Sequence, residues 1–217
     1  MKIKRLVLFS FLLLIILFFG FLYKDAIREV KIIGDVRKIN NIDKLKDINK
    51  NTISYIRIKG TKVNYPIVKY KDNDYYLKHS FDNSKNKYGW IFMDYRNEAF
   101  NNQNTIIYGH AMKNKTMFGS IKDMFKSSWL DNYKHEIKVY DNNEFVTYKI
   151  FSIYETEAVN DYLHTNFTSE EYKEFINTII KKSYYDFNTE VNEDSKIITL
   201  STCSRQNKRL VVHAIRV

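Results

Sequence analysis

The sequence contains little cysteine, proline and glycine: among 217 residues there are one Cys, one Pro and six Gly. A single cysteine cannot form an internal disulfide, so the fold has no disulfide framework. The chain also lacks a Gly-rich phosphate loop, a Cys-x-x-Cys pair, a His-Glu-x-x-His motif and any internal repeat. These absences leave nucleotide and zinc chemistry without support. We therefore expect no metal and no cofactor.

Aromatic and basic residues, in contrast, are abundant. The 17 Tyr and 15 Phe favour a packed globular body over a disordered chain. Lys and Arg number 35 against 25 Asp and Glu, which gives a formal net charge of +10. The basic residues are interleaved with acids and asparagines along the whole chain. This pattern favours an anionic envelope nearby over nucleic acid, and we expect no nucleic-acid partner.

The N-terminus predicts the compartment. Lys2, Lys4 and Arg5 precede an uncharged apolar run over residues 6–23, which as a helix would measure about 27 Å, close to the thickness of a bilayer core. No Ala-x-Ala cleavage site follows this run. We therefore predict that residues 1–23 form a cytoplasmic tail and an uncleaved, single-pass membrane anchor. The positive-inside rule then places residues 24–217 outside the membrane.

Residues 24–50 are predicted to form a helical stalk that packs against the body. Their apolar residues recur in steps of three, as on one face of a helix or of two short helices, with Gly34 as a candidate break. These residues are Ile27, Val30, Ile33, Val36, Ile39 and Ile42.

Residues 51–217 are predicted to form one domain of short strands. Strands at this spacing are typical of a barrel or a sandwich. Pro66 belongs at an edge or at the start of a strand, and residues 141–143 are expected to form a hairpin turn. The predicted strands are residues 53–58, 63–68, 89–93, 105–108, 135–140, 144–154, 197–203 and 209–212.

One helix is predicted within this domain. Thr168 and Glu171 form a capping box, and the apolar residues that follow lie on one face of a helix over residues 169–182. The helix ends in a basic turn, as the helix dipole favours. We expect it to cover the core within a long connection between strands.

Cys203 ends the apolar strand over residues 197–203. Outside the membrane an unpaired thiol is either incidental, as a small buried hydrophobe, or reactive. A reactive cysteine needs a base or cation nearby and donors for the oxyanion that forms when it attacks an acyl carbon. The sequence therefore has to supply these partners.

Two residues fit those roles. Among five histidines, His110 follows an apolar strand and Gly109, which would let the chain turn sharply at a strand end. Arg209 opens the strand after Cys203 and keeps its charge at physiological pH. It either forms a surface ion pair or donates to a substrate carbonyl or oxyanion.

These segments resemble those of class B sortases, the membrane-anchored cysteine transpeptidases of Gram-positive bacteria. Thr-Leu-Ser-Thr-Cys at residues 199–203 and Arg-Leu-Val-Val at 209–212 match the family's cysteine and arginine strands. Thr-Ile-Ile-Tyr-Gly-His at 105–110 matches its histidine strand. Residues 89–97 and 114–118 resemble further class B segments, and the similarity runs from about residue 55 to residue 217.

The resemblance implies a mainly β, eight-stranded barrel with N-terminal helices and one helix in the long connection after the sixth strand. It also implies that Cys203 attacks the Thr carbonyl of a sorting signal, often of the type Asn-Pro-x-Thr, to form a thioacyl enzyme. His110 would transfer protons and Arg209 would stabilise the oxyanion. The acceptor would be an amine of a peptidoglycan precursor or of the wall.

The same resemblance implies a peptide groove. Its residues would be Asn73, Leu77, Tyr162, Leu163 and Ser201. The chain departs from the family at two positions. Arg205 stands where some members have an acid, which argues against an Asp-assisted triad, and Ala158 replaces a groove threonine, which indicates a different sequence preference.

Three other functions compete with this interpretation. An L,D-transpeptidase would carry Ser-x-Gly-Cys-x-Arg, whereas no glycine lies near Cys203. A membrane-tethered cysteine protease would use the same nucleophile without transfer to an amine. A non-catalytic binding module would not need Cys203, His110 and Arg209 together.

Overall fold

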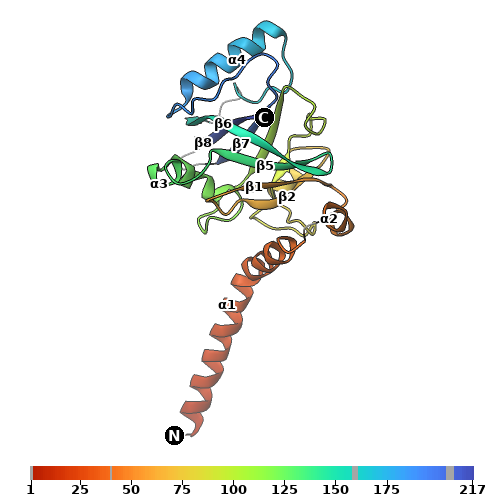
Figure 1. The fold of residues 1–217 in the computed structure, drawn as a ribbon. Coiled ribbons are helices and arrows are strands. Elements are labelled where there is room, and N and C mark those ends of the chain that lie inside the picture. Colours follow the sequence, from red (N-terminus) through yellow and green to blue (C-terminus); the bar gives the residue numbers. More distant parts are fainter. Residues whose placement is uncertain (1, 40, 158–160, 204–207) are drawn as a thin grey trace.

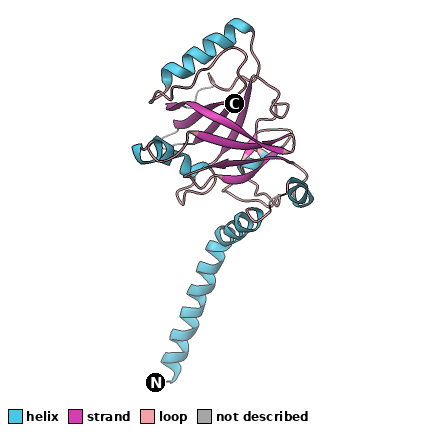
Figure 2. Cartoon of the chain, in the orientation of Figure 1, coloured by secondary structure: helices cyan, strands magenta, loops and turns pink. Residues whose placement is uncertain are grey.

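The computed structural model describes residues 2–39, 41–157, 161–203 and 208–217. It shows a β-barrel with one long helix projecting from it and another helix lying over one side (Figures 1 and 2). The helices are α1 Lys2–Val36, α2 Ile42–Ile48, η1 Tyr75–Leu77, η2 Phe118–Phe125, α3 Ser127–Leu130 and α4 Ser169–Lys182. The strands are β1 Thr52–Ile58, β2 Asn64–Lys69, β3 Phe92–Met93, β4 Asn104–Gly109, β5 Glu136–Asp141, β6 Glu144–Glu157, β7 Ile197–Cys203 and β8 Lys208–Arg216.

The strands close into a barrel in the order β1-β2-β3-β4-β7-β8-β6-β5, with β5 paired to β1. Two pairings are parallel, β2 with β3 and β4 with β7. The connection from β6 to β7 carries α4. The prediction of a mainly β, eight-stranded barrel with N-terminal helices and one helix after the sixth strand is therefore confirmed.

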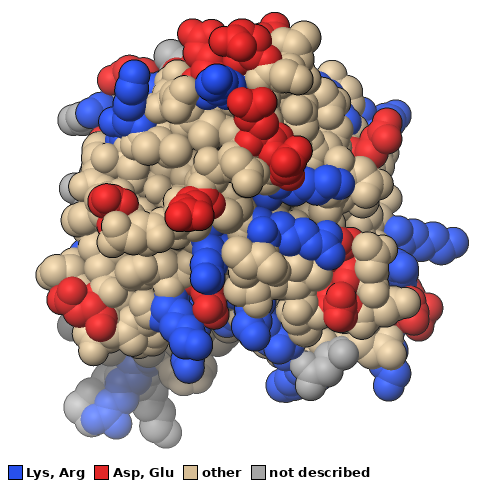
Figure 3. Space-filling model, turned by 45° about the horizontal axis from the view of Figure 1, so that its top comes forward, with Lys and Arg blue, Asp and Glu red and all other residues tan. Residues whose placement is uncertain are grey.

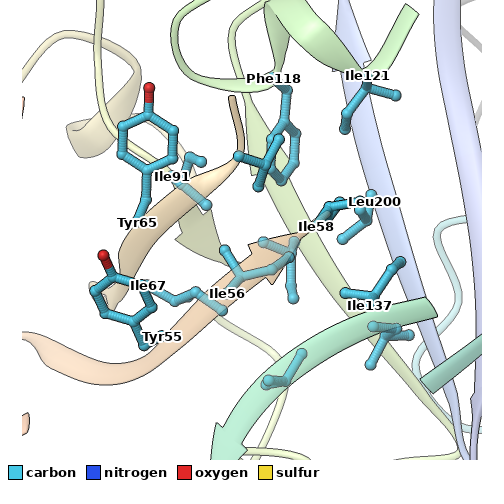
Figure 4. Close-up of a cluster of buried hydrophobic side chains, with 14 of the residues drawn as sticks. Tyr55, Ile56, Ile58, Tyr65, Ile67, Ile91, Phe118, Ile121, Ile137 and Leu200 are labelled. Carbon is cyan, nitrogen blue, oxygen red and sulfur yellow. The ribbon is translucent and has the colours of Figure 1, made fainter. Parts of the chain in front are cut away.

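The barrel interior is filled by branched and aromatic side chains from opposite strands (Figure 4). Ile56 of β1, Ile137 of β5 and Leu200 of β7 are fully buried, as is Phe118 of η2. Burying one such side chain contributes about 1.5–3 kcal/mol. Because Leu200 is part of this core, packing fixes the strand that ends at Cys203.

The second strand accommodates the only proline. The β2–β3 ladder begins at Val68, so on that side it requires no amide hydrogen from Pro66. The Pro66 carbonyl accepts a hydrogen bond of 2.9 Å from Trp90 Nε1. The strand predicted over residues 89–93 is shorter, because Gly89 has φ +58° and the Trp90 amide donates to a carbonyl of η1.

The hairpin and the capped helix form where the sequence predicts them. Asn142 and Asn143 have φ values of +48° and +69°, as a two-residue hairpin turn requires, and they join β5 to β6. Thr168 and Glu171 make the reciprocal capping bonds of α4. The buried face of α4 packs with strand residues in a second core cluster, and its members are Tyr172, Phe175, Ile176 and Ile179.

The first helix lies against the barrel only by its C-terminal part (Figure 1). Ile33 and Val36 are buried there, and the helix is not interrupted at Gly34. Among the described residues no single helix is both long and apolar enough to cross a membrane. The two segments Arg5–Gly20 and Tyr23–Val36, which meet at 50°, satisfy that test only together.

Charges of both signs share the surface. On the face drawn in Figure 3, Lys and Arg side chains lie beside Asp and Glu side chains, and acidic residues gather at the upper rim. Such a distribution adds short-range ion pairs, for example Lys208 with Glu155 at 3.3 Å. In this view the net positive charge is not concentrated in one uniformly basic face.

Candidate active site

Three neighbouring strands bring the predicted catalytic residues to one end of the barrel. In the parallel β4–β7 pair, Gly109 lies opposite Thr202, so His110 and Cys203 follow on adjacent chains. In the antiparallel β7–β8 pair, Cys203 lies directly opposite Arg209. The backbone register alone therefore brings these three residues together, although they are up to 99 positions apart in the chain.

A backbone carbonyl holds the imidazole of His110. His110 Nε2 lies 3.0 Å from the carbonyl oxygen of Leu77 in η1. Because a carbonyl can only accept, Nε2 carries the proton, and Nδ1 is the nitrogen left to take up or release one. The ring also packs against Gly89, where an added Cβ would lie 2.9 Å from His110 Cδ2.

Gly109 serves packing rather than a sharp turn. A Cβ at this position would lie 2.8 Å from the ring of Phe118 and 3.3 Å from Ile91 Cγ1. The amide of Phe118 in turn donates to the His110 carbonyl at 3.0 Å. The strand end is thus locked to η2, which corrects the expectation that the glycine is there to turn the chain.

The predicted groove residues come from three elements. Asn73 and Leu77 lie in the β2–β3 connection, Tyr162 and Leu163 lie between β6 and α4, and Ser201 lies on β7. The hydroxyls of Tyr162 and Ser201 lie 3.0 Å apart, and both side chains are buried.

Two further positions singled out in the sequence, Ala158 and Arg205, lie outside the described residues. Of the groove residues, Asn73 and Leu77 are half-buried, as is Leu163. They therefore expose part of their side chains, whereas the Tyr162–Ser201 pair supports the groove from below.

Sequence reasoning missed a buried carboxylate that connects to this region. Asp94 is fully buried and accepts from Arg96 Nε at 2.9 Å, from Tyr108 Oη at 2.9 Å and from Asn73 Nδ2 at 3.0 Å. Burial alone would raise the pKa of Asp94, but hydrogen bonds from Arg96 and Tyr108 hold it below its ordinary value. Its only sequence signal was its position in the class B-like segment 89–97.

A second buried network contains His213 of β8. Tyr154 Oη and Thr199 Oγ1 lie 3.0 and 2.9 Å from its two ring nitrogens. Burial lowers the pKa of His213 to about 3, so the ring is neutral and structural. Among the described residues no group of three His, Cys, Asp or Glu side chains is arranged to bind a metal ion.

Comparison with known proteins agrees with this geometry. A sequence model of the sortase domain family matches residues 56–217. Sortase B of Staphylococcus aureus is 37% identical over 180 residues, which cover 79% of this chain and 72% of the relative. The S. aureus enzyme solved with its substrate superposes with a TM-score of 0.76, covering 81% of this chain and 84% of the other at 35% identity; it has also been solved with triglycine. Sortase B of Bacillus anthracis gives a TM-score of 0.82 at 34% identity, covering 90% of this chain and 99% of the other.

The chain belongs to the sortase family of cysteine transpeptidases. Because its sequence relatives in both S. aureus and Listeria monocytogenes are sortase B, it is a class B sortase.

Proposed function

We propose that this sortase cleaves the sorting signal of a secreted protein and transfers the new acyl end to an amine of the cell wall. The Cys203 thiolate attacks the Thr carbonyl carbon of the signal, and the C–N bond breaks as the leaving amine takes a proton from His110. The acceptor amine then attacks the thioester, gives a proton to His110 and releases the thiolate. The observation that carries this proposal is the β4–β7–β8 register of Gly109, Thr202, Cys203 and Arg209.

Arg209 is assigned to the oxyanion. It lies opposite Cys203 across the β7–β8 ladder and is half-buried. A fixed guanidinium there stabilises negative charge that develops on the attacked carbonyl oxygen. His110, with its Nε2 proton held by Leu77, presents Nδ1 for proton transfer. No acid beside His110 is required by this arrangement, because the carbonyl already orients the ring.

The peptide and its acceptor are assigned by chemistry. Asn73, Leu77, Tyr162, Leu163 and Ser201 are proposed to form the groove for the sorting signal. The S. aureus relative solved with triglycine supports a primary amine as the second substrate. A peptidoglycan precursor carries such an amine at the outer face of the membrane.

The domain organisation fits these partners. We propose that residues 1–23 hold the chain in the membrane with the N-terminus in the cytoplasm, and that residues 24–50 are the stalk of an extracellular catalytic domain, residues 51–217. The apolar N-terminal part of α1 is exposed on every side, which a lipid environment would cover. The stalk residues Ile33 and Val36 instead pack on the barrel.

A transfer assay tests this function. The full chain in detergent is given labelled peptides with an Asn-Pro-x-Thr core, together with triglycine or a diaminopimelate stem peptide. We expect a ligated product with one of these amines and none from Cys203→Ala. Hydrolysis without transfer under every amine would identify a protease instead. Turnover that survives Cys203→Ala would contradict the assignment of the nucleophile.

Arg209→Ala separates oxyanion stabilisation from packing. Loss of one oxyanion donor lowers turnover by about two to three orders of magnitude. We expect that loss in kcat with little change in KM. A decrease below about tenfold would mean that Arg209 only positions the peptide or packs between the strands.

A further inference from the structure

The segment that carries Tyr162 and Leu163 is held by its carbonyl groups. Asn104 Nδ2 donates to the carbonyl oxygens of Tyr162 at 3.3 Å and His164 at 2.8 Å, and the Asn104 amide donates to that of Thr165 at 3.2 Å. Arg96 Nη2 donates to the carbonyl of Leu163 at 2.9 Å. Four consecutive carbonyls, residues 162–165, are therefore bound by two residues that flank β3 and β4.

A chain of hydrogen bonds fixes the orientation of Asn104. Its Oδ1 accepts from Thr199 Oγ1 at 2.6 Å. Since that hydroxyl has one proton, it must accept from His213 Nδ1 at 2.9 Å, which leaves His213 Nε2 to accept from Tyr154 Oη at 3.0 Å. Both amide hydrogens of Asn104 are thereby directed to the segment. The side chain of Asn104 is fully buried, so this arrangement is expensive to break.

A carboxylate fixes the orientation of Arg96. The guanidinium pairs with Asp94 through two parallel bonds, Nε to Oδ1 at 2.9 Å and Nη2 to Oδ2 at 2.8 Å, a geometry that lysine cannot reproduce. The same Nη2 reaches Leu163. On its other side Asp94 accepts from Asn73 Nδ2, and the Tyr95 amide donates to Asn73 Oδ1 at 3.0 Å.

These bonds also determine how Asn73 faces its surroundings. A carboxylate only accepts, so Asn73 must direct its NH₂ group to Asp94 and its carbonyl to the Tyr95 amide. One amide hydrogen and one carbonyl lone pair remain beyond these two bonds. That edge can pair with a peptide group of an extended ligand. The Asp94 carboxylate thus sets both the orientation of Asn73 and the reach of Arg96.

We propose that Arg96 and Asn104 are positioning residues for the sorting-signal groove, acting together with Asp94. They would set the separation and register of its two walls, Asn73 on one side and residues 162–165 on the other. Neither residue would touch the reacting atoms. The inference rests on the proposed function, because it requires that these walls bind the peptide.

This role predicts a defined split between binding and chemistry. Displacing residues 162–165 weakens peptide binding, whereas the strand register that holds Cys203, His110 and Arg209 does not depend on Arg96. The reactivity of the thiol toward a small reagent therefore stays unchanged. A residue that only stabilised the fold would alter both properties or neither.

The test uses the full chain in detergent and a fluorescein-labelled peptide with an Asn-Pro-Lys-Thr core. Its Kd is measured by fluorescence anisotropy in a Cys203→Ala background, where no chemistry occurs. Arg96→Lys in that background keeps the charge but loses the bidentate geometry, and we expect it to raise Kd about tenfold, the scale of one charge-assisted hydrogen bond. With Cys203 present, its rate of alkylation by iodoacetamide should change less than about twofold, because the thiolate surroundings are kept.

Arg216→Lys is the matched control. Arg216 Nη1 pairs with Asp141 at 2.9 Å, and its side chain is 37% exposed against 40% for Arg96. It ends β8 away from Arg209, so its replacement should leave Kd unchanged. An unchanged Kd in Arg96→Lys, or the same rise in Arg216→Lys, overturns the positioning role.

A second variant and the parent complete the test. Asn104→Asp keeps the acceptor of Thr199 but removes both donors to residues 162–165, and we expect the same rise in Kd with retained alkylation. Equal Kd values for this variant and its parent count against the proposal. Should the Cys203→Ala parent bind none of the Asn-Pro-x-Thr peptides and the intact enzyme transfer none, the groove assignment itself fails. That outcome is distinct from one in which the parent binds and the variants bind equally well.

Discussion

Two buried carboxylates fasten the same connection, residues 70–91, to the body in opposite ways. Asp94 is fully buried, and its oxygens accept from Arg96, Tyr108 and Asn73. Glu29 of α1 is 3% exposed. One of its oxygens accepts from Ser80 Oγ at 2.8 Å and from Asn86 Nδ2, while among the described residues the other contacts no partner.

The difference lies in charge. Asp94 has an arginine and keeps a pKa below its ordinary value despite burial. Burial raises the pKa of Glu29 from 4.5 to about 7, and its hydrogen bonds offset only part of that effect. The groove side of the connection is therefore held by a permanent ion pair. The side facing α1 is held by a group that titrates near neutral pH.

Both contacts bear on the active site through one residue. Leu77, whose carbonyl holds His110 at 3.0 Å, lies between Asn73 on the Asp94 side and Ser80 on the Glu29 side. The position of the imidazole thus depends on how each end of the connection is fixed. The two carboxylates can be separated by mutation.

The largest effect is expected from Asp94→Ala. It leaves Arg96 without its partner and the Asn73 and Tyr108 donors without an acceptor, and removing one partner of a buried pair costs about 4 kcal/mol. Urea denaturation of the full chain in detergent measures this loss. Asp141→Ala, which removes the partner of the exposed Arg216, is the control and should cost about 1 kcal/mol or less. Equal losses in the two variants would show that Asp94 is no more than a surface ion pair.

Glu29→Gln tests the other side by its pH dependence. The folded-state pKa of Glu29 lies above its unfolded value of 4.5, so the folded state binds more protons between pH 4.5 and about 7. Stability from this group is thus present at low pH and falls as pH rises through that window. Gln cannot titrate. Relative to the parent, Glu29→Gln should therefore gain about 3 kcal/mol between pH 4.5 and about pH 8.

Denaturation of the parent and Glu29→Gln side by side at several pH values checks this difference. Asp35→Asn on the same helix is the control, because Asp35 contacts only the exposed Lys38, at 3.9 Å. A stability difference that stays flat with pH for Glu29→Gln would show that Glu29 is ionised throughout. The α1 contact would then be as permanent as the Asp94 pair.

The barrel and the strand ends could be predicted because they depend on local sequence signals. The β-branched run at residues 197–203, the asparagine turn at 142–143 and the Thr168 capping box each specify a local conformation. A strand that ends in the only cysteine then places one candidate nucleophile. The assignment of the family came from the combination of such segments.

The two carboxylate networks could not be predicted in the same way. Asp94 connects residues 73, 96 and 108 with residue 163, and no periodicity relates these positions. Glu29 sits among charged residues of a helix whose exposed face has the same composition. Gly109 was predicted correctly as special but for the wrong reason, because the ring it makes room for comes from η2, an element with no clear sequence signal.

The smallest effects come from removing one hydroxyl donor at each carboxylate. Tyr108→Phe removes the bond of 2.9 Å to Asp94, and Ser80→Ala removes the bond of 2.8 Å to Glu29. Each should cost about 1 kcal/mol. The two losses should depend differently on pH, because a hydrogen bond to an ionised acceptor is about twice as strong as one to a neutral acceptor.

Asp94 stays ionised over the range in which the chain can be studied, so the cost of Tyr108→Phe should be the same at about pH 5 and about pH 8. Glu29 is mostly protonated at the lower pH and mostly ionised at the higher one, given its pKa of about 7. Ser80→Ala should therefore cost more at the higher pH, since the lost hydroxyl stabilised the charged form. Denaturation of both variants at the two pH values measures this. A cost of Ser80→Ala that falls with pH would mean that the hydroxyl stabilises the protonated acid, and the contrast between the two carboxylates would then lie in their burial alone.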